Sequence, residues 1–356
     1  MNTFTYVFLA AFTLSYGVQF WLSGRQKQYV LQHREQVPTA FSSRVSLEAH
    51  QKAADYTITK SKLHDIDSVV GMVFLLLLTL GGGISLVFDF WSTFELSPLT
   101  ASLSAVASIF VMMTLVEMPF SLYQTFVVEE KFGFNKNTVP QFLKDQLLSI
   151  TLTMAIGMPI LALILWVMDS IGELWWLYAW GIIISFSLLM SWLFPTVIAP
   201  LFNKFTPMED GPLKERIQEL LQRCGFNSQG IFIMDGSRRS GHGNAYFTGF
   251  GASKRVVFFD TLLERLNPDE IEAVLAHELG HFRHHHVIKR IALMFFVSFI
   301  GLALLGWLMN QDWFYAGLGI TQSSNYMALL LFLLVSPVFL FLLRPFMASY
   351  SRKNEF

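Results

Sequence analysis

Two histidines and a glutamate at helical spacing are the residues of this 356-residue chain best suited to chemistry. The run from His277 through Glu278 to His281 has the form H-E-x-x-H. Residues four apart lie on one face of an α-helix, so both imidazoles can bind one Zn²⁺ ion. Glu278 can serve as general base toward a water molecule that the ion activates. The run therefore predicts a catalytic zinc site of the metallopeptidase kind.

A well-defined helix start precedes this run. Asn267 is a favourable N-cap, Pro268 suits the first helical position, and Glu270 completes a capping box. Ile271, Val274 and Leu275 supply an apolar stripe at helical spacing. Because no breaker follows the second histidine before the next apolar segment, we expect one continuous helix to run from Pro268 into that segment.

A catalytic zinc site needs a third protein ligand, and the sequence offers two kinds. His284 lies on the same helical face, but about 10 Å along the axis from His277, which would strain a tetrahedral site. On a continuous helix His285 and His286 point elsewhere. Glu355, just after the last apolar segment, would give a His₂Glu site, although a solvated carboxylate is the ordinary alternative.

The composition is that of a membrane protein. Hydrophobic residues make up 53% of the chain and charged residues 14%, with a mean hydropathy of +0.47. A net charge of −1 gives no indication of nucleic-acid binding, and the single cysteine, Cys224, excludes an intrachain disulfide. Segments long and apolar enough to cross a bilayer are residues 4–22, 68–88, 100–122, 147–168, 174–198, 287–309 and 327–343.

The basic residues predict an orientation for these seven segments. All 25 Lys and Arg residues lie in residues 23–67, 123–146, 199–286 and 344–356 or at Lys289 and Arg290. The alternate connections hold none. By the positive-inside rule the basic side is cytoplasmic, so we expect the N-terminus outside and the H-E-x-x-H helix in the cytoplasm.

The predicted fold is therefore an all-α polytopic membrane protein with a small α+β cytoplasmic zinc-protease insertion between spans five and six. We divide it into residues 1–198, 199–286, 287–345 and 346–356: five spans, the insertion, two spans and a tail with the third ligand. Within the insertion we expect a helix at 212–224 and short strands at 231–234, 245–250 and 256–259.

The strand that begins at Asn244 is a candidate substrate site. Asn244, Ala245 and Tyr246 would form an exposed edge to which an extended peptide could add by main-chain hydrogen bonds. Alternatively Asn244 is a turn residue, because Gly241 and Gly243 precede it. The spacing does not decide between the two.

Four runs, at residues 123–136, 242–249, 274–281 and 351–356, make the chain resemble the type 1 CAAX prenyl proteases, integral-membrane zinc metalloproteases related to the yeast a-factor-converting enzyme. The match is closest to bacterial members. The resemblance implies zinc ligands at His277, His281 and Glu355, a catalytic Glu278 and a substrate strand at Asn244 and Ala245. It also implies that seven helices enclose a water-filled chamber.

In relatives of this type the chain continues past the residues that match Glu355 and Phe356 with an Ala and an Asp, and this Asp supports the metal ligands. A later region contributes a histidine that stabilises the oxyanion. The printed chain ends at Phe356, so we expect either a fragment or a shortened member.

The predicted function is zinc-dependent peptide hydrolysis of the CAAX-processing type in a bacterial inner membrane. The expected partners are membrane lipid and a peptide or protein substrate, prenylated or membrane-embedded. Two alternatives remain open: a quality-control protease of the heat-shock type, and a transporter or channel in which the motif is incidental.

Overall fold

The computed structural model describes residues 1–249, 254–321 and 323–355. The chain divides into two compact units. The first holds Met1–Phe132, Leu152–Trp176 and Ala303–Lys353, and the second holds Gly133–Thr151, Leu177–Leu302 and Asn354–Phe356.

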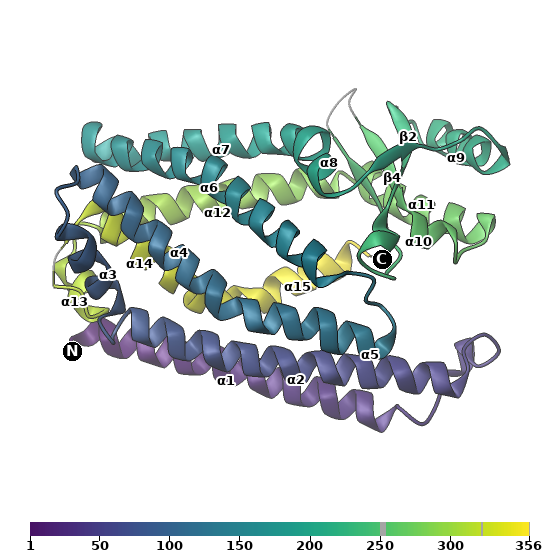
Figure 1. Cartoon of the computed structure of the whole chain (residues 1–356), viewed down its shortest axis with the longest axis horizontal. Helices are drawn as coiled ribbons and strands as arrows, with labels where there is room; N and C mark the ends of the chain where they lie inside the picture. The colour runs from purple at the N-terminus through teal and green to yellow at the C-terminus, as the bar shows by residue number, and fades with distance from the viewer. Residues whose placement is uncertain (250–253, 322, 356) are drawn as a thin grey trace. The chain divides into compact units, whose positions relative to one another are not determined.

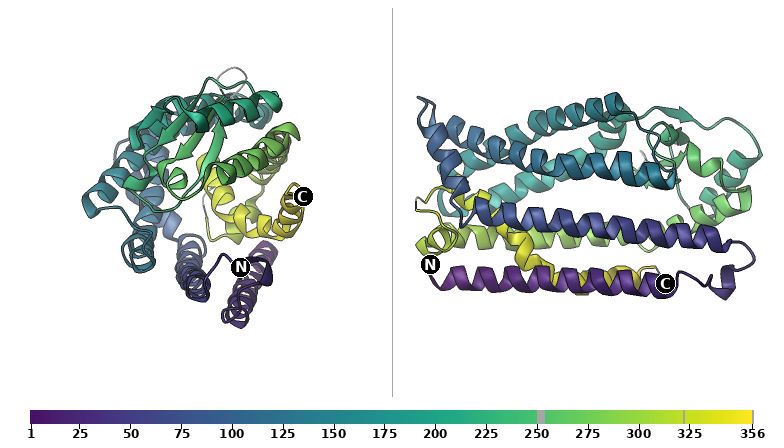
Figure 2. Two further views of the ribbon diagram at one scale, coloured as in Figure 1. Left: turned by 90° about the vertical axis from the view of Figure 1, so that its right-hand side faces the viewer. Right: turned by 60° about the horizontal axis from the view of Figure 1, so that its bottom comes forward.

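The regular elements described in the first unit are all helices. Its elements include α1 (Thr3–Gln32), η1 (Thr39–Phe41), α2 (Leu47–Leu78), α3 (Gly83–Ser92), α4 (Pro98–Tyr123), η2 (Gln124–Glu129), α5 (Glu130–Phe132), η3 (Gly172–Leu174), α13 (Asp312–Gly317), α14 (Asn325–Leu340), η7 (Phe341–Leu343) and α15 (Arg344–Lys353). Helices α1 and α2 lie side by side over much of their length (Figures 1 and 2). A capping box at Asn2 begins α1.

The second predicted span, 68–88, is not a single straight helix. Helix α2 ends at Leu78, α3 begins at Gly83, and the two are bent by 54°. Gly82 has φ +77°, in the left-handed region that favours glycine. Among the described residues six helices are long and apolar enough to cross a membrane, or seven spans if the bent pair counts as one.

The second unit combines membrane-length helices with a sheet. Its elements are the first part of α6 (Val139–Ser170), as far as Thr151, and most of α7 (Trp175–Leu193) and α12 (His286–Leu308), together with η4 (Phe194–Ile198), α8 (Ala199–Phe202), β1 (Phe205–Pro207), α9 (Pro212–Arg223), β2 (Gly230–Met234), η5 (Gly236–Arg238), β3 (Ala245–Thr248), β4 (Arg255–Phe259), α10 (Asp260–Leu263) and α11 (Pro268–Arg283).

The sheet has the strand order β1-β2-β4-β3, in which β2 and β4 are parallel and the outer pairs antiparallel. The predicted strands correspond to β2, β3 and β4, but β3 ends at Thr248, so the strand predicted at 245–250 is too long at Gly249, and Phe250 lies outside the described residues. Strand β1 was not predicted, because three residues carry too short a pattern. Within the described residues β3 is an edge strand, as expected.

Helices α9 and α11 pack on one face of this sheet. Alternate strand residues such as Ile231, Val256 and Phe258 share a buried core with Ile217 of α9 and Leu275 of α11. The predicted helix at 212–224 is α9, which ends at Arg223, with Gly225 at φ +66° just after it. This core fixes α11 against the sheet.

The expected continuous helix from Pro268 into the membrane segment is wrong. Helix α11 ends at Arg283 with His284 as C-cap, and α12 begins at His286. Between them His285 adopts φ +55°, in the left-handed region. A non-glycine residue pays a cost of about 1 kcal/mol there, and sequence patterns give no warning of it.

Candidate metal centre

Helix α11, which carries the predicted metal-binding motif, is stabilised by its N-terminal cap and by its buried face. The predicted capping box is present: the Asn267 and Glu270 backbone N–H groups each donate to the other residue's side chain, both at 3.0 Å. Ile271, Leu275 and Leu279, one turn apart, are each 1% exposed in the core. With that face buried, the face that bears His277 and His281 is turned out of the core.

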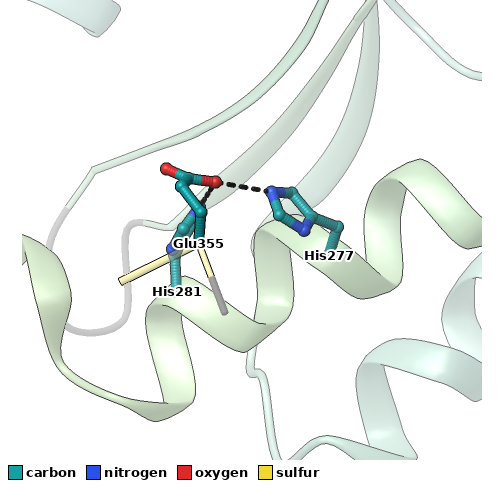
Figure 3. Close-up of side chains that lie close together, drawn as sticks. All are labelled: His277, His281 and Glu355. Atoms are coloured by element: carbon teal, nitrogen blue, oxygen red, sulfur yellow. Dashed lines mark ion pairs between the residues drawn. The ribbon is translucent and has the colours of Figure 1, made fainter. Parts of the chain in front are cut away.

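The two histidines and Glu355 come together as candidate ligands (Figure 3). The Glu355 Oε2 atom lies 3.3 Å from His277 Nε2 and 3.6 Å from His281 Nε2. Ligand atoms bound to zinc at about 2.0–2.1 Å in a tetrahedron lie about 3.3 Å apart. Both carboxylate–imidazole distances are therefore close to the ligand spacing of a zinc site, and the donor set is the three-ligand set that leaves a position open for water in catalytic sites.

This cluster is accessible, as a reactive centre requires. The His277 and Glu355 side chains are 52% and 50% exposed, and His281 is 24% exposed. In the described residues it is the one group of three or more potential ligands close enough to share an ion. His284, the alternative third ligand, is not in that group; it is exposed at the C-cap of α11.

A cavity of about 780 Å³ opens beside this cluster within the second unit. Glu278 and His281 line it together with Tyr246 of β3. Most of the remaining wall is apolar: it includes Met190, Phe194, Pro195, Phe226, Phe247, Phe282, Val287, Ile288 and Ile291. Its volume lies within the range of small-molecule and cofactor pockets, about 300–1,000 Å³. The predicted base thus faces a space that can admit an apolar group.

The three candidate substrate residues differ in what they can offer. Ala245 is 7% exposed, with its side chain in the core, so only its backbone is available to a ligand. Tyr246 lines the cavity, and burial raises the pKa of its hydroxyl, which stays neutral at physiological pH. Asn244 is exposed, but its Oδ1 accepts from the Ala245 N–H at 2.9 Å, as a turn residue does.

The loop before β3 is held by a bidentate ion pair. Arg239 donates to both carboxylate oxygens of Asp145, from Nε at 2.7 Å and from Nη2 at 2.9 Å, and also to Asn203 at 2.8 Å. Main-chain bonds from Lys136 N to Arg239 O and from Gly241 N to Phe134 O join the same segments. The edge strand therefore begins from a fixed anchor.

Sequence reasoning missed two contributors to this region. The Lys254 ammonium lies in the cavity wall, 4.0 Å from the centre of the Phe282 ring and 5.2 Å from that of Phe226. The His286 ring, expected to point elsewhere, forms a 2.9 Å hydrogen bond with His281. Neither contact has a local sequence signal, because each depends on how separate segments pack.

Two family models together match nearly the whole chain. The model for the CAAX prenyl protease N-terminal region, described as five membrane helices, matches residues 26–204, and the model for peptidase family M48 matches residues 207–356. The boundary between them falls at β1, the first strand of the sheet in the second unit.

Named relatives agree with both models. The chain is 34% identical to the CAAX prenyl protease 1 homolog of Dictyostelium discoideum, over all of this chain and 85% of that protein. It is 44% identical to CAAX prenyl protease 1 of Saccharomyces cerevisiae, over 58% of this chain and 46% of the yeast protein. The crystal structure of S. mikatae Ste24p superposes with a TM-score of 0.89 at 32% identity, covering this chain entirely and 87% of that one.

Sequence, fold and relatives converge. The apolar helices are those of a multi-pass membrane protein. The matched family is one of metal-dependent peptidases. The two histidines of the H-E-x-x-H helix lie at ligand distance from a carboxylate, that of Glu355. The chain belongs to peptidase family M48, in its CAAX prenyl protease group, and is a membrane metalloendopeptidase.

Proposed function

We propose that the chain is a zinc endopeptidase in which His277, His281 and Glu355 hold the metal and Glu278 is the catalytic base. The observation that carries this proposal is the approach of the Glu355 carboxylate to both Nε2 atoms, at 3.3 and 3.6 Å. The set of two imidazoles and one carboxylate is typical of catalytic zinc in peptidases.

The metal, the base and the substrate strand each have a separate role in the proposed reaction. A bound zinc ion supplies Lewis-acid chemistry, which polarises the scissile carbonyl and acidifies the attacking water. Glu278 takes the proton of that water as it attacks and returns it to the leaving amine. The exposed edge of β3, which begins at Ala245, holds the substrate as an added strand, with the Asn244 side chain before it and Tyr246 in the cavity wall. The buried face of α11 keeps Glu278 in register with the ligands.

The substrate we propose is the C-terminal peptide of a CAAX-type protein, processed by endoproteolysis at the membrane. The support is the name shared by the relatives and the apolar cavity beside Glu278. An apolar wall rich in Phe side chains, with Val287, Ile288 and Ile291, suits a prenyl chain or an aliphatic residue next to the scissile bond.

For the placement in the cell we propose a bacterial inner membrane, with the N-terminus outside and the metal centre on the cytoplasmic side. Seven spans, with the bent α2–α3 pair as one of them, would enclose a chamber. The orientation is supported by the restriction of all 25 Lys and Arg residues to alternate connections and the edge of one span.

The test is an assay of purified protein with two peptides in parallel: a prenylated CAAX peptide and an unrelated peptide of equal length. We expect cleavage of the first only, on the C-terminal side of the prenylated cysteine. Equal cleavage of both would favour a quality-control role and would refute the CAAX assignment. The Glu278→Gln variant is expected to bind zinc at wild-type stoichiometry and to hydrolyse neither peptide, so undiminished hydrolysis would refute the role of Glu278.

A further inference from the structure

One candidate ligand, His281, has a second imidazole behind it. Its Nδ1 atom lies 2.9 Å from the Nδ1 atom of His286, and the two ring centres are 5.2 Å apart. The other ring nitrogen of His281, Nε2, is the one that faces Glu355. The His281 ring is thus positioned from both sides.

The break between α11 and α12 creates this contact. Residues five apart on a continuous helix point about 140° apart around its axis, so their rings would diverge. Here His284 caps α11 with its N–H donating to Gly280 O at 3.1 Å, and His285 turns the chain at φ +55°. The next helix then begins at His286, whose ring points back to His281.

Hydrogen-bond chemistry fixes the direction of the contact once a metal is bound. A histidine that binds metal through Nε2 carries its proton on Nδ1 and donates it. The Nδ1 atom of His286 must then be the acceptor, which requires a neutral ring with its own proton on Nε2. His286 is not among the three residues whose ligand atoms lie close enough to share an ion, and its contact is with the His281 ring.

We infer that His286 is a positioning residue, which holds His281 in the tautomer and orientation that bind the metal. This inference rests on the proposed function, because it takes His281 as a zinc ligand. Residues that orient zinc ligands in this way contribute about 10- to 100-fold to metal affinity. A non-glycine residue kept in the left-handed region at His285 is consistent with a turn that serves the site.

The experiment measures zinc affinity by competition with a chromophoric chelator, on the purified full chain in detergent. His286→Leu removes the acceptor and is expected to weaken zinc binding about 10- to 100-fold. His286→Asn places an amide oxygen near the position of Nδ1 and is expected to restore affinity to within about threefold of wild type. His286→Ala repeats the deletion if the leucine variant does not fold.

His284→Asn is the matched control. His284 is exposed, and its ring only stacks on that of His286, with centres 5.6 Å apart. We expect zinc affinity unchanged in this variant. The inference is overturned if the leucine or alanine variant binds zinc as wild type does, or if asparagine loses as much affinity as leucine, since only an acceptor at this position distinguishes them.

A separate arm isolates the proposed function. His277→Ala is expected to abolish tight zinc binding. If it does not, the ligand assignment itself fails, whatever the outcome at His286. If it does, while His286→Leu has no effect, only the positioning role fails.

Discussion

Replacement of Leu279 by alanine tests whether the core beneath α11 is what holds the catalytic helix. Leu279 follows Glu278 directly and is 1% exposed among residues of the second unit's core. The substitution removes three buried carbons, worth about 2.4 kcal/mol at about 0.8 kcal/mol each. Incomplete collapse of the cavity adds to that loss, so we expect a destabilisation of about 3 kcal/mol.

For a domain the size of the second unit, a loss of about 3 kcal/mol lowers the melting temperature by about 6–12 °C. The assay is thermal unfolding of purified protein in detergent, followed by loss of zinc-dependent cleavage over the same temperatures. Ala273→Gln, on the exposed side of the same helix, is the control. Because glutamine is a good helix former and nothing is buried there, this variant is expected to change stability by less than about 0.5 kcal/mol. A Leu279→Ala melting temperature within about 2 °C of wild type would refute the packing argument.

Three further predictions address the cap, the loop anchor and the metal. Asn267→Ala removes the capping box and should cost about 1 kcal/mol of stability, measured by thermal unfolding; an unchanged midpoint would contradict a role for the cap. Arg239→Ala breaks the ion pair that holds the start of the substrate strand, so it should lower kcat/KM about tenfold or more while zinc affinity stays unchanged. Weaker zinc binding in this variant would contradict a role confined to the substrate strand. Zinc at 100 times its dissociation constant should stabilise wild type by about 2.7 kcal/mol, and a 100-fold loss of affinity in Glu355→Ala should reduce this to about 0.4 kcal/mol.

Sequence patterns predicted the elements whose causes are local. The capping box at Asn267, the apolar stripe of α11 and the amphipathic α9 all arise from residues within one or two turns of each other. The three strands with strong β-formers were predicted as well. The histidine pair followed for the same reason, since helical spacing alone brings it to one face.

Features that depend on tertiary packing were not predicted. The turn at His285 has no glycine or proline to mark it, and the contact between His281 and His286 exists only because of that turn. The bend after Leu78 did have a signal in the glycines 81–83, but hydropathy averaged over a span hides it. Glu355, more than seventy residues from the motif, was a candidate by topology, and its distance from the histidines could come only from the fold.

The most direct test of the account is the zinc X-ray absorption spectrum of the purified, metal-loaded protein. We predict two imidazole ligands, from His277 and His281, with the remaining coordination by oxygen at about 2.0–2.2 Å. A third imidazole in place of the carboxylate would contradict the assignment of Glu355 and would favour His284, the alternative third ligand.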